Sequence, residues 1–428
     1  MQTKIQIILK RLLQLHPKSI DLSLNRIKRL LKDLNNPEKK IKNVIQVVGT
    51  NGKHSVCSTL REIFETAGYS VNMNISPSIR KFNERYYLSG KYISDDILYD
   101  LLTEVEKVNK NKNITFHEFI CACFLLEASR NKSDVNIIEA GLFFRLDASN
   151  VLKKNIASVV MPIGIDHKDF LKKGTIDEIV YEKCSHLLND SKIFISEQKN
   201  AILKKIKNNI SNNSSEKFFF GQHYGCEKNK NGFYYKDKLG KISFPLPNLH
   251  GDFQISNVST AIAVARNLNQ YKITINHINK AITQIKSEGR LQNITKGKLR
   301  KYVSKNNKIL IDGAHNPLAA LAVKKYLESF SSRKKIFMIL AMMANKDHKK
   351  FIQIFKDKVH SIVTLDIPNE PGSIKKKKLS KIALSCGIPT TTGTSIKETL
   401  KEISLQDKNA IIFCTGSLYF AGSILNLN

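Results

Sequence analysis

The sequence predicts an α/β fold with a phosphate-binding loop near its start. Apolar runs that suit buried strands alternate along the chain with segments of helical periodicity. One of these runs is followed by a glycine-bracketed turn and an amphipathic helix, which is the arrangement of a P-loop. A chain of 428 residues is long for one core, so two domains are expected.

The predicted phosphate loop follows a strand at 44–48 and precedes a helix that ends at Gly68. Its glycines let the backbone approach a phosphate, Lys53 would reach the terminal phosphates, and the Ser55 hydroxyl would lie near the Mg²⁺ of the nucleotide. With two residues between its glycines the turn is shorter than the usual G-x-x-x-x-G-K-[ST] motif, and Gly-Lys turns also occur in loops that bind nothing. The predicted nucleotide contacts are Gly49, Thr50, Asn51, Gly52, Lys53, His54 and Ser55.

The net charge of +32 does not by itself indicate a nucleic-acid binder. The excess is mainly lysine spread along the whole chain, whereas RNA and DNA binders concentrate charge on one face. The dense run at 375–378 is predicted to lie on a solvated helix. Such a field speeds the encounter with small anions, so we expect anionic small-molecule partners and no nucleic acid.

The sequence also favours a cytoplasmic protein without a membrane segment. The first apolar stretch, 5–15, is interrupted by Lys10 and Arg11 and is predicted to be an amphipathic helix rather than a signal peptide. No apolar run approaches the ~20 residues that span a bilayer. The seven cysteines are odd in number and form no Cys-x-x-Cys pair, which fits a reducing compartment.

Residues 1–293 are predicted to form the first domain, with a polar stretch of no clear period at 74–94. Gly232 and Pro245 bound a predicted hairpin. The predicted helices are an N-terminal segment to about 36, then 95–109, 116–130, 176–188, 255–268 and 274–287, and the further strands are 135–140 and 156–165.

A break at 288–291 separates this series from a second one, so residues 294–428 are predicted to form a smaller α/β domain. Its predicted elements include strands at 309–312, 335–341 and 410–414 and a helix at 317–330.

A series of motifs then carries a family resemblance over nearly the whole chain. The motifs are, in order, Gly49-Thr50-Asn51-Gly52-Lys53, Ser76-Pro77, Phe82-Asn83-Glu84-Arg85, Glu139-Ala140-Gly141-Leu142, Arg145-Leu146-Asp147-Ala148-Ser149-Asn150, Asp166-His167, Glu182-Lys183, Gly289-Arg290-Leu291, Asp312-Gly313-Ala314-His315-Asn316-Pro317, Lys346-Asp347 and Thr415-Gly416-Ser417-Leu418. In this order the chain resembles a folylpolyglutamate synthase/dihydrofolate synthase of the Mur ligase superfamily.

The resemblance implies a three-layer P-loop ATP-binding domain followed by a smaller Rossmann-like domain, both Mur ligase-like. It implies ATP-dependent ligation of L-glutamate to dihydropteroate, to a folate, or to both, through an acyl phosphate. ATP and Mg²⁺ would be the cofactors and a monomer the working form. Which glutamate is added, and which folate is preferred, stays open at this point.

The resemblance also implies roles for residues. Ser76, Glu139 and His167 would ligate Mg²⁺, a set that suits a hard cation. Asn257, Arg290 and Asp312 would contact the nucleotide. Arg85 and His315 would hold glutamate or the acyl phosphate, and Lys183 matches a lysine that the family carbamylates with CO₂.

Each residue has a plainer interpretation when taken alone. Glu139 could be a solvated strand end, His167 an ordinary polar side chain, Arg85 a surface ion pair, and Asp312 part of a turn. Three rival functions also stay open: a family member that binds ATP or folate without efficient ligation, a cell-wall Mur-type ligase, and an RNA-binding protein. Only about 43 residues precede the loop, whereas a cell-wall ligase needs a nucleotide-sugar domain there.

Residues in several motifs depart from the family pattern. His54 stands where the family usually has glycine, and Cys184, Ser185 and His186 replace small residues after Lys183. Phe143 and Phe144 replace a pair of glycines, and we expect both rings to pack inward rather than to stack on a ligand.

Overall fold

The computed structural model of the protein describes residues 4–18, 21–331 and 333–428. They form two compact units. The first contains residues up to 163 together with 175–247 and 255–285, and the second contains 164–174, 248–254 and 286–428. Segments 164–174 and 248–254 therefore fold with the second unit although they lie inside residues 1–293.

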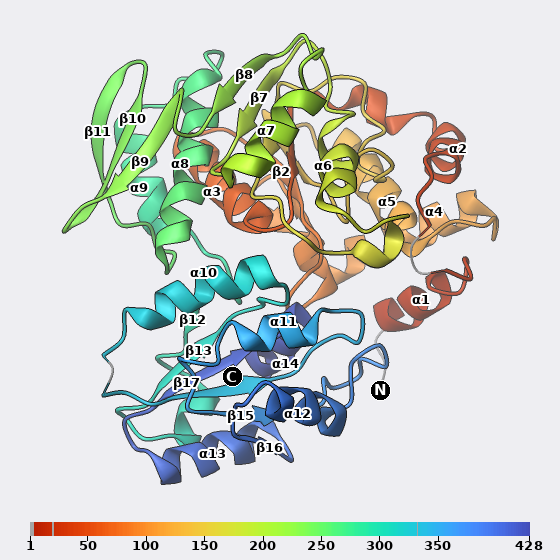
Figure 1. The fold of residues 1–428 in the computed structure, drawn as a ribbon. Coiled ribbons are helices and arrows are strands. Elements are labelled where there is room, and N and C mark those ends of the chain that lie inside the picture. Colours follow the sequence, from red (N-terminus) through yellow and green to blue (C-terminus); the bar gives the residue numbers. More distant parts are fainter. Residues whose placement is uncertain (1–3, 19–20, 332) are drawn as a thin grey trace. The chain divides into compact units, whose positions relative to one another are not determined.

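The first unit is built on an eight-stranded sheet in the described residues, with strand order β4-β3-β2-β5-β1-β6-β7-β8. Figure 1 labels β2, β7 and β8 of this sheet. Strands β2, β5, β1, β6, β7 and β8 are parallel, and the β3–β4 pair adds antiparallel to β2. All five residues of β1 are buried, as expected for a central parallel strand. The strands are β1 Val44–Val48, β2 Val71–Asn74, β3 Tyr86–Leu88, β4 Lys91–Tyr92, β5 Val135–Glu139, β6 Ala157–Val160, β7 Lys192–Ile195 and β8 Glu216–Phe219.

Helices cover this sheet and bury a large apolar cluster. Helix α3 contacts β1, β2 and β5, and α9 packs on α3. The helices α1, α2, α4 and α5 contribute to one hydrophobic core. The helices are α1 Lys4–Leu12, α2 Asn25–Asp33, α3 Lys53–Thr66, α4 Asp95–Asn109, α5 Phe116–Arg130, α6 Ile176–Cys184, α7 Asn200–Asn209, α8 Asp252–Asn267, whose first turn belongs to the second unit, and α9 Ile275–Gln284.

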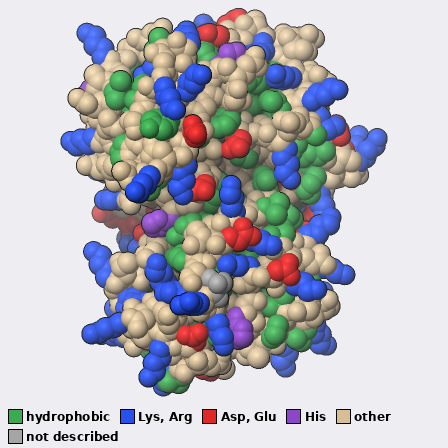
Figure 2. All heavy atoms as spheres, turned by 60° about the vertical axis from the view of Figure 1, so that its left-hand side comes forward, with side chains coloured by type: hydrophobic (Ala, Val, Ile, Leu, Met, Phe, Trp, Pro, Cys, Tyr) green, Lys and Arg blue, Asp and Glu red, His purple; other side chains and the backbone are tan. Residues whose placement is uncertain are grey.

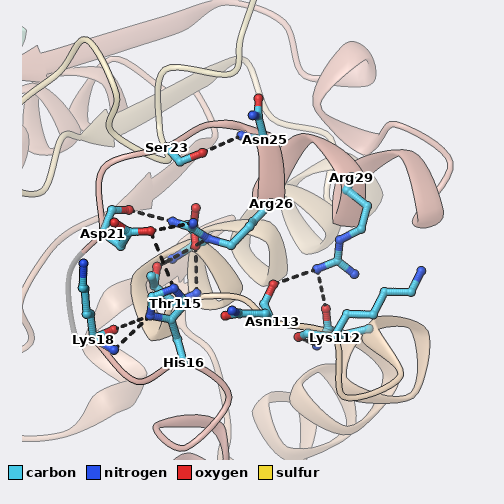
Figure 3. A network of polar contacts seen from close by, with 12 residues as sticks. His16, Lys18, Asp21, Ser23, Asn25, Arg26, Arg29, Lys112, Asn113 and Thr115 are labelled. Atoms are coloured by element: carbon cyan, nitrogen blue, oxygen red, sulfur yellow. Dashed lines mark hydrogen bonds and ion pairs between the residues drawn. The ribbon is translucent and has the colours of Figure 1, made fainter.

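Helix α2 is fixed to the start of α5 by a guanidinium group that reaches two carboxylates (Figure 3). Arg26 Nε donates to Glu118 Oε2 at 2.9 Å and Arg26 Nη1 donates to Asp21 Oδ2 at 2.7 Å. The amide and hydroxyl of Thr115 donate to the same Glu118 oxygen, each at 2.8 Å. One buried carboxylate thus caps α5 and anchors α2, with charge-assisted bonds that exceed neutral ones in strength.

A three-stranded antiparallel sheet completes the first unit. It consists of β9 Tyr224–Lys228, β10 Gly232–Asp237 and β11 Gly240–Pro245. The β10–β11 pair is the hairpin that the sequence predicts, with Gly232 opposite Pro245.

The second unit is a six-stranded sheet in the part of the chain that the structure describes, ordered β12-β13-β17-β14-β15-β16. All neighbours pair in parallel except the short β12, which matches the Rossmann-like fold that was expected. Its elements are β12 Gln292–Asn293, β13 Lys308–Ile311, α10 Pro317–Glu328, β14 Ile336–Leu340, α11 His348–Gln353, β15 Ser361–Thr364, α12 Lys376–Ser385, β16 Thr390–Thr392, α13 Ile396–Gln406, β17 Ile411–Thr415 and α14 Leu418–Leu427.

The α/β prediction is therefore confirmed, with several local differences. Predicted helices 176–188 and 274–287 are shorter, because α6 ends at Cys184 and α9 ends at Gln284. The N-terminal helical segment is two helices, α1 and α2. Strand 156–165 is shorter than predicted, because β6 ends at Val160 and Pro162 lacks an amide hydrogen for the ladder. Within 74–94, predicted as irregular, Tyr86–Leu88 and Lys91–Tyr92 form an edge hairpin.

The basic side chains do not gather into one patch on the face drawn in Figure 2. Lysines and arginines lie there among acidic, apolar and other side chains. Among the described residues, no helix combines the length and the apolar content that a bilayer crossing requires.

Candidate active site

The phosphate loop joins β1 to α3 and needs glycine at both ends. Gly49 and Gly52 have φ of +153° and +83°. A Cβ on Gly49 would lie 2.7 Å from Met161 Cβ, and one on Gly52 would lie 2.7 Å from Asn257 Oδ1. Any other residue would strain the backbone and collide with these neighbours. The predicted nucleotide residue Asn257, on α8, is thus in the wall of the loop.

Two backbone amides of the loop donate hydrogen bonds to a carbonyl group just after the end of β6. Thr50 N and Asn51 N donate to Pro162 O at 3.0 and 3.2 Å. These two N–H groups are therefore turned toward the segment after β6, rather than toward a shared anion spot. The first turn of α3, which includes Lys53, His54 and Ser55, presents the amides that a helix cannot satisfy itself, and it carries the positive end of the helix dipole.

Four predicted site residues converge beside this loop. Lys53 Nζ donates to Gly49 O at 3.2 Å and lies 3.9 Å from Glu139 Oε1. Glu139 ends β5 with 4% of its surface exposed, and its Oε2 accepts from Ser76 N at 3.1 Å. Arg85 Nη1 in turn donates to Ser76 Oγ at 3.2 Å. A buried carboxylate, a hydroxyl and two cations thus meet at one end of the sheet.

The oxygens of Ser76 and Glu139 suit the predicted magnesium ion. Hydroxyl and carboxylate oxygens are hard donors, and Mg²⁺ binds through one or two carboxylates while keeping waters and substrate phosphates. Glu139 is held next to the loop that would carry those phosphates, so the donor set fits the ion. His167 belongs to the second unit and starts the 3₁₀ segment Lys168–Phe170. Its role as a third ligand stays a prediction, because no cluster of three acidic, histidine or cysteine side chains suited to a metal is found among the described residues.

Lys183 is a buried cation at the end of α6. It is 3% exposed, and its Nζ donates to Gly49 O at 3.0 Å and to Leu142 O at 2.8 Å. The same Nζ lies 5.4 Å from the centre of the Phe143 ring. The lysine therefore connects the phosphate loop with the turn that follows β5.

Both phenylalanines of that turn pack inward, as predicted. Phe143 and Phe144 are 1% and 0% exposed. Beside them Arg145 Nη2 donates to Glu182 Oε1 at 2.7 Å, and Arg145 N donates to Glu182 O at 2.8 Å. The rings are thus part of the core beneath the site, and the arginine is fixed to α6.

Asp147 holds this turn together by accepting several hydrogen bonds. Its Oδ2 accepts from Gly141 N at 3.0 Å, and its Oδ1 accepts from the amide and hydroxyl of Ser149 at 2.9 and 2.6 Å. Burial alone would raise the pKa of this carboxyl. The His117 ring, whose Nε2 is 3.5 Å away, and the Ser149 donors outweigh that effect and lower the pKa to about 2.

In the second unit, a buried carboxylate that sequence reasoning did not select stands among the predicted residues. Asp166 Oδ1 accepts from Lys346 Nζ at 2.7 Å, and Oδ2 accepts from Asn316 Nδ2 at 3.0 Å. His315 Nε2 is 3.3 Å from Oδ2 and His167 Nε2 is 3.8 Å from it. Burial opposes ionisation, but these neighbours hold the pKa of Asp166 well below its usual range.

Asp166 thus brings His315 and His167 together, and Lys346 balances its charge. Both Asp166 and Lys346 stand inside the quoted motifs. The sequence feature that could have identified Asp166 is its position directly after the apolar run that ends at Ile165.

Both carboxylate oxygens of the predicted nucleotide residue Asp312 accept hydrogen bonds from backbone amides. Its Oδ2 accepts from Leu291 N at 2.8 Å and its Oδ1 from Ala314 N at 2.7 Å. Burial raises its pKa, against the opposing charge of Arg290. Asp312 therefore fastens segment 289–291 to the end of β13, and a nucleotide contact from either residue stays a prediction.

Comparison with known sequences decides the family. The family model described as Mur ligase middle domain matches residues 47–265, and the model described as dihydrofolate synthetase, C-terminal domain, matches residues 295–427. The chain is a Mur ligase of the dihydrofolate synthase/folylpolyglutamate synthase family. The family resemblance seen in the motifs is thereby confirmed.

Relatives in this Mur ligase family span almost the whole chain. A probable dihydrofolate synthetase of Schizosaccharomyces pombe is 25% identical, over 95% of this chain and 98% of its own. The dihydrofolate synthase/folylpolyglutamate synthase of Bacillus subtilis is 28% identical, over 94% of each chain. The structure of Escherichia coli FolC in complex with DHPP and ADP has a TM-score of 0.86, with 23% identity over 98% of this chain and 96% of that one. This last likeness establishes the shared fold.

Proposed function

We propose that this Mur ligase joins L-glutamate to dihydropteroate, to a folylglutamate, or to both, at the expense of ATP. The observation that carries the proposal is the meeting of Lys53, Glu139 and Ser76 at the phosphate loop of a chain in this family. Its relatives in Bacillus subtilis and Schizosaccharomyces pombe bear the names of enzymes with these activities.

The chemistry requires activation of a carboxylate. An oxygen of the acceptor carboxylate attacks the γ-phosphorus of ATP, the bond to the β-phosphate oxygen breaks, and ADP leaves. The amine of glutamate then attacks the acyl carbon, phosphate departs with the C–O electron pair, and the nitrogen releases a proton. Negative charge gathers in both steps, so fixed cations and backbone dipoles are the main source of catalysis.

In this proposal each residue contributes through charge and position. Lys53 neutralises the transferred phosphate, and the first turn of α3 orients it. Arg85 is held on Ser76 in the first unit and His315 beside Asp166 in the second, and each carries donors that suit a phosphate or a carboxylate. Ser76 and Glu139 would hold Mg²⁺, which when bound would supply Lewis-acid polarisation of the phosphoryl oxygens.

The decisive experiment is a product assay with two separate acceptors. Purified protein is given ATP, Mg²⁺ and glutamate with either dihydropteroate or a tetrahydrofolate, and products are identified by mass. Glutamate addition to either acceptor, with ADP formed in equal amount, supports the proposal and also decides which glutamate is added. ATP turnover that ignores both acceptors and glutamate would contradict it, and binding without turnover would favour the weakened family member.

Three further properties belong to the proposal. We infer a domain division near residue 293, a monomer in solution, and a reducing cytosol as the place of action. Support for the last is that all seven cysteines are unpaired and six are buried. Light scattering at micromolar concentration tests the monomer, and a mass of two chains would overturn it.

A further inference from the structure

We propose that Gln198 is a positioning residue for the phosphate loop, because its side-chain amide fixes the peptide group that accepts two of the loop's backbone amides. Gln198 lies in the segment between β7 and α7. The proposal rests on the proposed function in one respect, since it takes the loop 49–52 as the place where the ATP phosphates bind. A second readout, the exchange of two backbone amides, is independent of nucleotide and of turnover.

The segment after β6 is the support on which the loop rests. Pro162 O accepts hydrogen bonds from Thr50 N at 3.0 Å and from Asn51 N at 3.2 Å. Met161 also lies against the loop, because a Cβ on Gly49 would come within 2.7 Å of Met161 Cβ. The course of the loop therefore depends on where Met161 and Pro162 are held.

The strand ladder ends before this support does, and a side chain replaces it. Strand β6 ends at Val160, and Pro162 has no amide hydrogen to donate. Gln198 Oε1 accepts from Ile163 N at 3.0 Å, and Gln198 Nε2 donates to Met161 O at 3.1 Å. One side-chain amide thus holds the peptide groups on both sides of Pro162.

The bond to Ile163 acts directly on the carbonyl that the loop uses. Ile163 N–H and Pro162 C=O belong to one planar peptide group, so fixing the N–H also fixes the direction of the carbonyl oxygen. Hydrogen bonds in series polarise one another, which strengthens the bonds that Thr50 N and Asn51 N donate. Gln198, this peptide group and the two loop amides therefore form one chain of hydrogen bonds.

A side-chain amide suits both partners of Gln198. Its oxygen is an acceptor and its nitrogen carries two donors, whereas a carboxylate would have no donor for Met161 O. The orientation of the amide follows from its partners, since a flipped group would set its donors against Ile163 N–H. The nitrogen also donates to Ser196 Oγ at 3.3 Å. Both polar atoms of Gln198 are thus bonded inside the protein, as expected for a group that holds backbone rather than ligand.

The test compares Gln198→Met, which removes the amide at nearly constant size, with a matched control. Asn213 in the same unit has a similar pattern of bonds to backbone. Its Nδ2 donates to Leu187 O at 2.9 Å, and its Oδ1 accepts from Ser215 N at 2.9 Å. Asn213→Leu therefore removes a comparable set of bonds from segments that belong neither to the loop nor to its support.

Hydrogen exchange of the Thr50 and Asn51 amides, resolved by NMR, is the first measurement. We expect Gln198→Met to speed the exchange of both amides about five- to tenfold, the effect of one lost hydrogen bond on local opening. Asn213→Leu should leave both rates within about twofold of the parent. Unchanged exchange in Gln198→Met, or an equal increase in the two variants, overturns the proposal.

Binding of a non-hydrolysable ATP analogue with Mg²⁺, measured by calorimetry, tests the consequence for the phosphates. We expect Gln198→Met to weaken binding about tenfold and Asn213→Leu to leave it within about twofold. In the ligation assay, Gln198→Met should raise the KM for ATP and leave the KM for glutamate unchanged. Analogue binding that is unchanged in Gln198→Met, or equally weakened in both variants, refutes the positioning role. If the parent binds no analogue, the proposed function fails, and the exchange rates alone still decide whether Gln198 holds the loop.

Discussion

Replacing Asp166 by alanine is expected to destabilise the second unit by about 3–5 kcal/mol, the usual effect of removing one partner of a buried ion pair. The side chains of Asp166 and Lys346 are 7% and 9% exposed, and their charged atoms are 2.7 Å apart. At an effective dielectric constant of about 20 they attract by roughly 6 kcal/mol before desolvation is subtracted. The variant leaves the Lys346 ammonium buried without its carboxylate, and Asn316 loses one acceptor of its side-chain amide.

Amide exchange followed by mass spectrometry measures this effect locally, on peptides that cover 309–316 and 336–346. A local probe is needed because a protein of two units need not unfold in a single step. The double variant Asp166→Ala/Lys346→Met removes both charges, so it should cost less than the two single variants combined, with a coupling of about 2 kcal/mol or more. The exposed pair Glu104–Arg130, with side chains 43% and 46% exposed, is the control and should couple by less than about 1 kcal/mol.

Additive effects of the two substitutions within about 0.5 kcal/mol would refute the reasoning. So would an Asp166→Ala protein whose second unit opens as rarely as that of the parent. Either result would mean that Lys346 finds another acceptor, or that water enters, and Asp166 would then not organise His315 and Asn316.

Three further outcomes follow from the site. Lys53→Ala should abolish ligation with the circular dichroism spectrum unchanged, and activity within about tenfold of the parent would remove Lys53 from the phosphate site. Glu139→Gln should raise the Mg²⁺ concentration needed for half-maximal activity steeply, and an unchanged titration would exclude Glu139 as a ligand. For Asp147, the pKa of about 2 in the folded protein lies below the ordinary 3.8. The ionised carboxylate therefore stabilises the folded state above pH 4, and this stabilisation is lost as the pH falls toward 2. Asp147→Asn should therefore cost about 2 kcal/mol at neutral pH and flatten the acid limb of the unfolding curve.

The elements that sequence predicts well are those whose signals are local. Helices 95–109 and 116–130 were predicted with the bounds that α4 and α5 have, since Ser94 and Thr115 cap them and apolar positions fill them. The phosphate loop was equally visible, because its glycines and lysine are contiguous. The β3–β4 hairpin was missed because strands of three and two residues are too short to show a period.

Features that depend on tertiary contact were not accessible in the same way. That segment 164–174 folds with the second unit could not be predicted, because its partners are Lys346, Asn316 and His315, far along the chain. The setting of Lys183 depends on two carbonyl groups and a ring contributed by other elements. The direction of the Thr50 and Asn51 amides depends on a single carbonyl, Pro162 O. Residue types at motif positions therefore indicated the site, and their hydrogen-bond partners came only from the structure.

The early position of segment 164–174 also has a consequence for synthesis on the ribosome. Asp166 is translated 180 residues before Lys346, its partner in the second unit. At about 5–20 residues per second the carboxylate waits roughly 10–35 s for that lysine to be made. During this interval the first unit can begin to fold around its own sheet, while Asp166 in segment 164–174 still lacks its partner Lys346. A nascent chain stalled before residue 346 should thus expose 164–174 to a chaperone or protease that the finished protein resists.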